Sequence, residues 1–201
     1  NYKLTTRYAH LYKPGAYTDF FVNASGFWLL KNFWDVSLTT GYFADHHDYF
    51  VLGNPATYQR FVKRPSYGYF TLSGSTDSRK KMYFNYNVLF ADFFNSAPNK
   101  DYHILQGGLR YRFGNKFSLE LSHQHEGETD YIISAGRETN GEPIIAFVDF
   151  TDVTSILSGI YNFTPRLNLT LRVRHYWNEV KYLSFHNVDT KGELVNRPFI
   201  N

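Results

Sequence analysis

Strict alternation of apolar and polar side chains is the feature of this sequence that most constrains its fold. It is clearest from Leu167 to Trp177, where the odd positions hold Leu, Leu, Leu, Val, His and Trp and the even positions hold Asn, Thr, Arg, Arg and Tyr. A period of two places these sets on opposite faces of a β-strand, whereas a helix would spread the aliphatic side chains around its circumference. The segment is therefore predicted to be a long strand with one apolar face.

The same alternation continues across short polar turns and predicts antiparallel hairpins. Pairing Phe113 with Phe117 across Gly114-Asn115-Lys116 places Arg110 directly opposite Glu120. Such an opposite-charge pair stabilises an antiparallel ladder. Short turns are expected near residues 31–33, 77–81, 114–116 and 164–166. The pattern indicates at least eight strands in four hairpins, and residues 3–11 are a candidate for one more.

The composition leaves two classes of all-β protein. Nineteen Phe, 17 Tyr and 3 Trp in 201 residues favour strands. The absence of Cys excludes disulfides and thiolate metal sites, and no apolar run approaches the roughly 20 residues that a transmembrane helix needs. The net charge of +3 comes from scattered basic residues, which is not the footprint of a nucleic-acid-binding protein. The remaining classes are a soluble β-sandwich or barrel and a transmembrane β-barrel.

Loop lengths and aromatic positions favour the transmembrane β-barrel. Long loops are predicted near residues 44–66, 94–101, 127–150 and 178–201, and they alternate with the short turns as in outer-membrane barrels. Aromatic side chains gather near both strand ends, as in the girdles at membrane interfaces. The girdle candidates are Trp34, Tyr42, Phe113, Phe117, Tyr161, Phe163 and Trp177. We predict an antiparallel transmembrane β-barrel, with residues 1–201 forming a single domain that is part of a larger barrel.

Charged residues at the parity opposite the aliphatic side chains would line the lumen of this barrel. They are Asp35, Arg110, Arg112, Glu120, Arg172 and Arg174. The four arginines would attract anions in a pore. The alternative is a network of internal ion pairs, with Glu120 and Asp35, that plugs and stiffens the barrel. Both interpretations remain open.

One part of the sequence resembles a known family. The motif from Tyr161 through Asn162-Phe163-Thr164-Pro165-Arg166-Leu167 to Trp177 carries the resemblance, together with Tyr182, Phe185, Gly192 and Leu194 in the tail. It is similar to the C-terminal barrel of large Bacteroidota-type outer-membrane proteins, classified as a domain of unknown function. Members carry a carbohydrate-binding-module-like β-sandwich before the barrel. The resemblance implies a location and a fold, with a polysaccharide-related or envelope-assembly context, and no established activity.

No catalytic or metal site is predicted. His123 and His125 share one face of a strand and could reach a single metal ion, but a solvated His pair at a strand end needs no metal, so no metal or cofactor is expected. The Gly-x-Ser-x-Gly elbow and the glycine-rich phosphate and dinucleotide motifs are absent from the sequence. Ser122 and His123 are neighbours whose side chains point to opposite faces. The protein is therefore not expected to be an enzyme.

The predicted function is that of a porin-like outer-membrane β-barrel protein with a channel, transport or envelope-scaffold role. Its expected location is the bacterial outer membrane of a Gram-negative envelope. Its expected partners are the lipid bilayer and other outer-membrane or periplasmic proteins, with no nucleic acid. Two alternatives come from other classes: a soluble β-barrel or sandwich that binds a small ligand or glycan, and a barrel-embedded hydrolase.

Overall fold

The computed structural model describes residues 1–13, 15–52, 60–94 and 101–197. Ten strands form one sheet in the order β1-β2-β3-β6-β7-β8-β9-β10-β11-β12, and β4 and β5 form a second, two-stranded sheet. The strands are β1 (Tyr2–Leu11), β2 (Ala16–Leu29), β3 (Asp35–Phe43), β4 (His46–Asp48), β5 (Val62–Arg64), β6 (Tyr67–Ser75), β7 (Met82–Phe93), β8 (Asp101–Arg112), β9 (Phe117–Arg137), β10 (Pro143–Thr164), β11 (Leu167–Val188) and β12 (Leu194–Arg197). Over these residues, no helix has the length and apolar character needed to span a bilayer.

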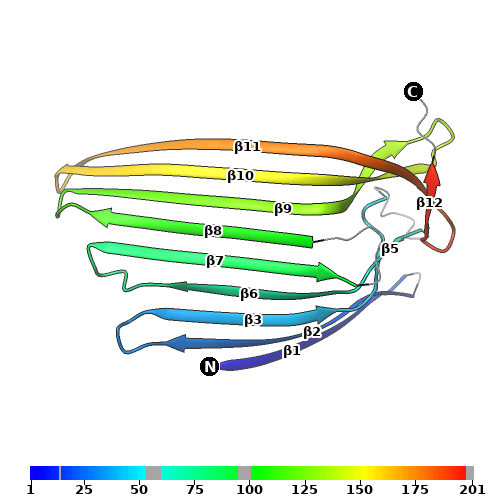
Figure 1. Cartoon of the computed structure of the whole chain (residues 1–201), viewed down its shortest axis with the longest axis horizontal. Helices are drawn as coiled ribbons and strands as arrows, with labels where there is room; N and C mark the ends of the chain where they lie inside the picture. Colours follow the sequence, from blue (N-terminus) through cyan, green and yellow to red (C-terminus); the bar gives the residue numbers. More distant parts are fainter. Residues whose placement is uncertain (14, 53–59, 95–100, 198–201) are drawn as a thin grey trace.

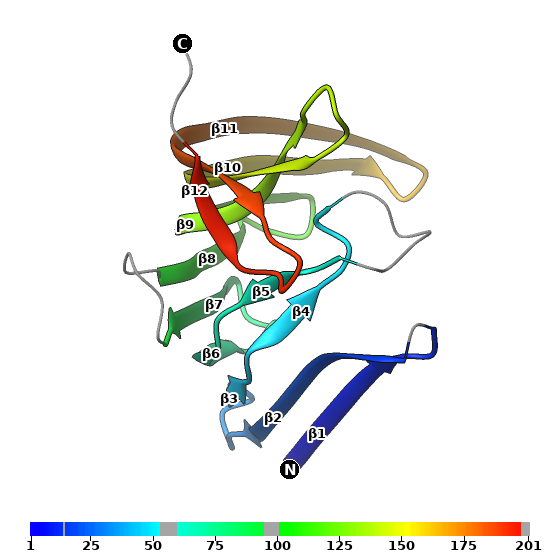
Figure 2. The same ribbon diagram turned by 90° about the vertical axis from the view of Figure 1, so that its right-hand side faces the viewer.

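The large sheet is antiparallel throughout, and it curves strongly. Its long strands lie side by side (Figure 1), and the view along them shows an open curve with β1 and β11 at its two sides (Figure 2). In the described part of the chain, β1 pairs only with β2, and β11 pairs with β12 only over Phe185–Val188. The predicted all-β antiparallel fold is therefore confirmed, while the sheet itself is open rather than a closed barrel.

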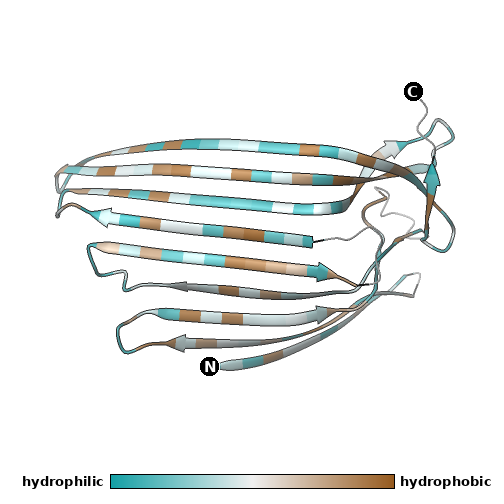
Figure 3. Ribbon diagram, in the orientation of Figure 1, coloured by the Kyte–Doolittle hydropathy of each residue, from teal (hydrophilic) through white to brown (hydrophobic). Residues whose placement is uncertain are grey.

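The register of the strands fixes which side chains share a face. Leu38 is paired with Leu72, Leu72 with Val88, and Val88 with Leu105. The predicted pairing of Arg110 with Glu120 is confirmed. Side chains at directly paired positions lie on the same face, so each row is chemically uniform over several strands. On β9, β10 and β11 the resulting alternation is visible as brown bands between teal and white ones (Figure 3).

The small hairpin of β4 and β5 shows which face is concave. It lies inside the curve of the sheet (Figure 2). His46 of β4 packs edge-on against Phe43 and Tyr67, with ring centroids 5.0 and 6.3 Å apart. Positions that alternate with these, such as Tyr42 and Leu72, consequently lie on the convex face. The apolar row of Leu38, Leu72, Val88 and Leu105 therefore lies on the convex face.

Apolar side chains on the convex face remain accessible. Leu105, Leu109, Leu121, Leu157 and Leu171 are between 40% and 65% exposed. The polar side chains that alternate with them along each strand occupy the concave face. This is the reverse of a soluble protein, in which a curved sheet buries its apolar side chains inside.

A compact apolar core lies at the end of the molecule opposite the short turns. It contains Leu52, Val62, Ile132, Ile145, Phe147 and Val188, with Val51 and Leu194 packed against it. These side chains come from the β4–β5 region and from the extended ends of β9, β10 and β11. The core thus joins the two halves of the sheet across its concave side.

The long strands correct the predicted loops. Residues 127–150 were predicted as a loop, but β9 continues to Arg137 and β10 begins at Pro143. The prediction failed because Ile145, Ala146, Phe147 and Val148 are buried in succession, and a strand buried on both faces loses its alternation.

Strands also replace parts of the other predicted loops. β11 and β12 occupy much of the predicted loop at 178–201, and β4 and β5 lie within the predicted loop at 44–66. The predicted loop near 94–101 lies largely outside the described residues. The candidate strand at residues 3–11 is confirmed as β1.

Ile145→Ala should lower the free energy of unfolding by about 2–5 kcal/mol, because the substitution leaves a cavity in the packed core. Ile145 is 0% exposed, whereas Leu171 is 65% exposed and supplies the matched control. Leu171→Ala should change the free energy by less than about 1 kcal/mol. Denaturant unfolding of the purified protein measures both values, and equal losses would contradict the placement of the core.

Candidate functional site

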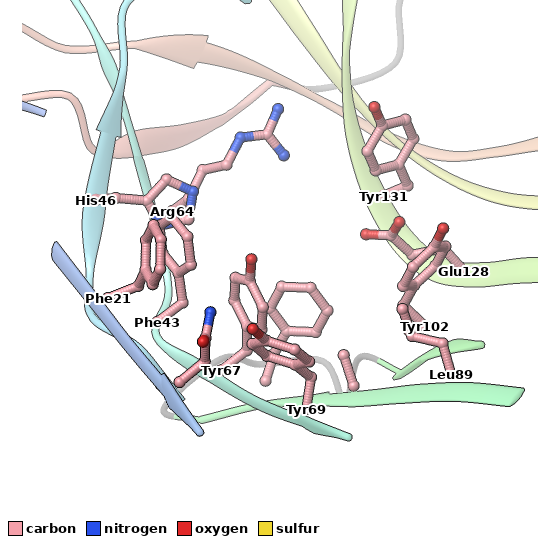
Figure 4. Close-up of a pocket in the computed structure, with 13 residues that line it drawn as sticks. Phe21, Phe43, His46, Arg64, Tyr67, Tyr69, Leu89, Tyr102, Glu128 and Tyr131 are labelled. Atoms are coloured by element: carbon pink, nitrogen blue, oxygen red, sulfur yellow. The ribbon is translucent and has the colours of Figure 1, made fainter. Parts of the chain in front are cut away.

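A cavity of about 470 Å³ opens on the concave face, beneath the β4–β5 hairpin. Its volume lies within the range of about 300–1,000 Å³ that is usual for ligand pockets. The lining residues come from strands β2, β3 and β6 to β9 of the large sheet and from the hairpin, and Figure 4 shows them around the open space. They are Phe21, Asn23, Phe43, His46, Arg64, Tyr67, Tyr69, Leu89, Ala91, Phe93, Tyr102, Glu128 and Tyr131.

A row of four aromatic rings in contact forms one side of this cavity. Register places Phe21, Phe43, Tyr67 and Phe93 next to one another on β2, β3, β6 and β7. Ring centroids are 5.5 Å apart for Phe21 and Phe43, 5.1 Å for Phe43 and Tyr67, and 5.0 Å for Tyr67 and Phe93. The guanidinium of Arg7 covers the outer end of the row, 4.8 Å from the centre of the Phe21 ring. These contacts stabilise the rings in fixed positions.

Tyr69 forms part of the floor because Gly41 leaves room for its ring. A Cβ atom at Gly41 would lie 2.8 Å from one ring carbon of Tyr69 and 2.9 Å from another. The ring therefore lies flat over the backbone of β3. Its second face is directed into the cavity, as Figure 4 shows. Glycine at position 41 is required by this close approach rather than by backbone conformation.

The roof of the cavity is the β4–β5 hairpin, which polar contacts hold in place. Arg64 donates from Nε to Asp48 at 2.8 Å and from its terminal nitrogen to the carbonyl of Ile132 at 3.1 Å. The Asp45 carboxylate accepts a hydrogen bond from the Ser66 amide at 2.7 Å, and the Asp45 carbonyl accepts one from the Tyr17 hydroxyl at 2.8 Å. The hairpin and its flanking residues are thus attached to β2 and β9, and the two ends of the segment are linked to each other.

Two further basic residues tie the roof to the far side of the curve. Lys63 forms an ion pair with Glu193, and its amide donates to the carbonyl of Gly192 at 2.9 Å. Arg60 pairs with Glu142 and also donates to the carbonyl of Val188. These contacts connect the segment between β3 and β6 to the β9–β10 and β11–β12 connections.

The remaining wall carries hydroxyl and carboxylate groups. Tyr102, Glu128 and Tyr131 line the cavity from β8 and β9. The Tyr102 hydroxyl donates to Glu126 at 2.8 Å. In Figure 4, Glu128 and Arg64 point toward the open space from opposite sides. The cavity therefore combines flat apolar ring surfaces with polar groups at its rim.

The six charged candidates predicted for the lumen share the concave face but lie away from this cavity. Register connects Arg110 to Glu120, Glu120 to Ser158, and Ser158 to Arg172. Arg110 packs over the ring of Tyr83 at 4.8 Å and donates to the carbonyl of Ser78 at 2.7 Å. These residues are grouped toward the short turns.

The other residues predicted to line the lumen also lie on the concave face. Arg112 is paired with Ser118, and Arg174 with Ile156. Asp35 is paired with Ser75 and accepts a hydrogen bond from its hydroxyl. Toward the opposite end, the concave face becomes acidic through Glu126, Glu128 and Asp152, so the sign of its charge changes along the strands.

The predicted girdle residues lie at the two ends of the sheet. At the short-turn end, ring contacts of 4.8, 5.0, 6.1 and 4.7 Å link Tyr111, Phe113, Phe117, Tyr161 and Phe163 in series. Trp34 is 47% exposed in the turn between β2 and β3. At the opposite end, Tyr42 stacks on Phe94 at 6.1 Å, and Trp177 is 45% exposed. Their role at a membrane stays a prediction.

The histidine candidates make separate contacts on the convex face. His125 Nδ1 lies 3.2 Å from His103 Nε2, while His123 Nδ1 lies 2.8 Å from the Ser155 hydroxyl. Within the described ranges, no group of three or more metal-ligating side chains is found. The register of β9 and β10 creates the His123–Ser155 contact, which the alternation of the sequence alone does not predict. Asp152 is at the opposite parity and cannot join it.

The cavity itself was also missed. One signal was present: Phe21, Phe43, Tyr67, Tyr69 and Phe93 are aromatic residues at the parity that carries most of the polar side chains. Placing rings on the polar face is unusual in a strand whose other face is apolar. The contribution of the β4–β5 hairpin had no comparable signal.

The fold and the site together define a class: an all-β protein with a single curved antiparallel sheet, an apolar convex face and an aromatic-lined cavity on its polar concave face. The chain belongs to a family described as a domain of unknown function (DUF5916), whose family model matches residues 1–201. The resemblance to a family of unknown function is confirmed to that extent. No curated protein and no solved structure matches the chain significantly.

Acidification should loosen the β4–β5 hairpin through His46. Burial lowers the pKa of His46 below its ordinary value of 6.5; the hydrogen bond to the Ala44 carbonyl opposes this shift, nearby Arg64 adds to it, and Asp48 and Asp19 oppose it. The neutral ring is therefore favoured in the folded state, and stability is lost as the pH falls below 6.5 and through the lowered pKa. Hydrogen exchange of the β4 and β5 amides, corrected for intrinsic rates, should show less protection at about pH 5 than at about pH 7.5.

His46→Gln is the control for this measurement. Its hairpin should show much less pH dependence, because glutamine does not titrate. Protection that increased on acidification of the unmodified protein would contradict the prediction.

Proposed function

We propose that this chain forms the wall of an outer-membrane β-barrel with a channel or transport role. The observation that carries the proposal is the distribution of side chains over the two faces of the sheet. Leu105, Leu109, Leu121, Leu157 and Leu171 of the convex face are 40% to 65% exposed, and rows of charged and amide side chains line the concave face. Lipid hydrocarbon around the convex face would solvate the apolar side chains, and water along the concave face would solvate the polar ones, as in transmembrane barrels.

Strand length and aromatic position support the same proposal. Strands β2, β3, β6, β7 and β8 contain 14, 9, 9, 12 and 12 residues. A membrane crossing takes about 9–11 tilted residues. Rings at both ends of the sheet would occupy the two interfaces, where Tyr and Trp place an apolar body in lipid and a polar group in water.

The open edges of the sheet need partner strands under this proposal. Over Leu167–Leu183, the outer edge of β11 has no paired strand in the described residues, and the outer edge of β1 has none either. Backbone N–H and C=O groups left unpaired in hydrocarbon cost several kcal/mol each. The proposal therefore includes further strands of the same protein that pair with β1 and β11 and close the barrel.

The concave face would line the passage. One row across it is neutral and polar, and consists of Ser37, Ser73, Asn87, Gln106, Gln124 and Thr154. On the turn side of this row lie four arginines together with Asp35 and Glu120, and on the other side lie Glu126, Glu128 and Asp152. Such rings of charge control which ions pass through a pore.

The resemblance supports a more specific context. We place the protein in the outer membrane of a Bacteroidota-type Gram-negative envelope, with a polysaccharide-related or assembly role beside other outer-membrane or periplasmic proteins. A soluble ligand-binding sheet fits less well, because its apolar face would remain in water. No catalytic role is proposed for the His123–Ser155 pair, since Asp152 lies on the opposite face of β10.

Leu121→Arg should block membrane insertion, whereas Ser122→Arg should be tolerated. Leu121 faces outward between Leu109 and Leu157, and the adjacent Ser122 faces the concave side. Arginine on the lipid face near the bilayer midplane costs about 2–4 kcal/mol. The folded fraction in carbonate-washed outer membranes measures the difference. Equal insertion of both variants, or release of the unmodified protein by carbonate without detergent, would refute the proposal.

The full-length protein in planar bilayers should conduct anions better than cations, because Arg172 and Arg174 lie on the concave face near the short turns. Replacing both with Gln should lower the anion-to-cation permeability ratio by about twofold or more. Reversal potentials in asymmetric KCl measure this ratio. Exchange of the convex Leu171 and Val173 for Ala is the control and should leave the ratio unchanged. A bias for cations in the unmodified protein would contradict the predicted role of these arginines.

A further inference from the structure

The cavity beneath the β4–β5 hairpin has the two kinds of surface that a sugar ring needs. A pyranose is apolar on its C–H faces and polar around its edge, where hydroxyl groups both donate and accept hydrogen bonds. Tyr69 presents one flat ring face from the cavity floor, because its other face rests on the backbone at Gly41. Aromatic rings provide such a platform with little loss of conformational entropy.

The rim of the cavity supplies groups around the Tyr69 ring that can form hydrogen bonds with the hydroxyl groups of a sugar. Glu128 and the Tyr67 hydroxyl point toward the open space, and Asn23 lines it from β2. A carboxylate accepts from sugar hydroxyls, an amide both donates and accepts, and a phenol does the same. The volume of about 470 Å³ exceeds what one monosaccharide fills.

The charges of the site favour a neutral ligand. Arg64, the guanidinium nearest the cavity, already donates to Asp48 at 2.8 Å and to the Ile132 carbonyl at 3.1 Å. Glu128 on the opposite wall would repel a carboxylate or phosphate. A purely apolar ligand would remove water from the polar rim without adding hydrogen bonds to it, which costs free energy.

The concave surface next to the cavity also carries neutral side chains that can form hydrogen bonds. Gly41 and Tyr69 are paired on the concave face. The next concave row toward the short turns pairs Thr39 with Thr71. The next row contains Asn87 and Gln106, again neutral hydrogen-bonding side chains. A ligand longer than the cavity would therefore extend along the concave face over hydroxyl and amide groups.

We infer that this cavity is a binding site for a neutral oligosaccharide, with one sugar ring stacked on Tyr69 and its hydroxyl groups bonded to Glu128 and its neighbours. The inference is independent of the proposed membrane location, because it depends on the concave face alone. It gives the loop end of the sheet a recognition function that the proposed channel does not require.

Isothermal titration calorimetry of the purified full-length protein tests this site. The probes are maltohexaose, cellohexaose and xylohexaose, in a detergent without a sugar headgroup. At least one should bind with a Kd below about 1 mM. Tyr69→Ala should weaken this binding by about tenfold or more, because the stacking surface is lost. Tyr69→Phe keeps the ring and should stay within about threefold of the unmodified protein.

Two further variants separate the site from general damage to the fold. Gly41→Val should weaken binding by about tenfold or more, since its side chain would displace the Tyr69 ring from the floor. Tyr176→Ala removes another tyrosine of the concave parity, on β11, and should leave the affinity unchanged. Binding of none of the three sugars, or equal losses in the Tyr69→Ala and Tyr176→Ala proteins, would overturn the inference. A protein that binds sugar but fails to insert into membranes would overturn only the membrane proposal.

Discussion

The structure depends on one constraint: each pair of neighbouring strands keeps its apolar side chains on the same face of the sheet. Leu38, Leu72, Val88 and Leu105 form one continuous row because each pairing keeps the same register. A slip of one residue in any strand would turn its apolar set toward the polar side. The short turns thus determine the chemistry of both faces, since each of them fixes the register of two long strands. Register shifts in β10 occur near its ends, at Ile144–Ile145, Phe147–Phe150 and Asn162–Thr164.

The curvature has a second support, which comes from the segment between β3 and β6. Lys63 and Arg60 reach across to Glu193 and Glu142, but partly exposed ion pairs of this kind contribute little, about 0–1 kcal/mol each. Burial of Val62 against Ile145 and its neighbours contributes more, because both side chains are 0% exposed. The ion pairs therefore set the position of the hairpin, and the apolar core supplies most of its stability. The same core fixes the roof of the cavity.

The sequence predicted those parts of the fold that depend on local pattern. Alternation indicated the strands, and the three-residue turn after Phe113 was enough to pair Arg110 with Glu120. It did not predict that residues 127–150 extend two strands, because Ile145 to Val148 are buried in succession, and Ile145 and Phe147 share a core with the distant Val62. The cavity depends on similar long-range contacts. Phe43 and Tyr69 could be assigned to a face from parity, but the packing of His46 and Arg64 above them could not.

The concave face has different chemistry at its two ends, and this order has a consequence for any solute that moves along it. Aromatic rings and Glu128 lie at the loop end, neutral amides and hydroxyls follow at Asn87 and Gln106, and Arg110 and Arg172 lie nearest the turns. A neutral polar molecule would meet ring faces first and hydrogen-bonding side chains next. An anion entering from the same end would first meet carboxylates, which raise its energy before the arginines lower it. Recognition at the loop end and charge selection at the turn end can therefore operate on different solutes within one curved sheet.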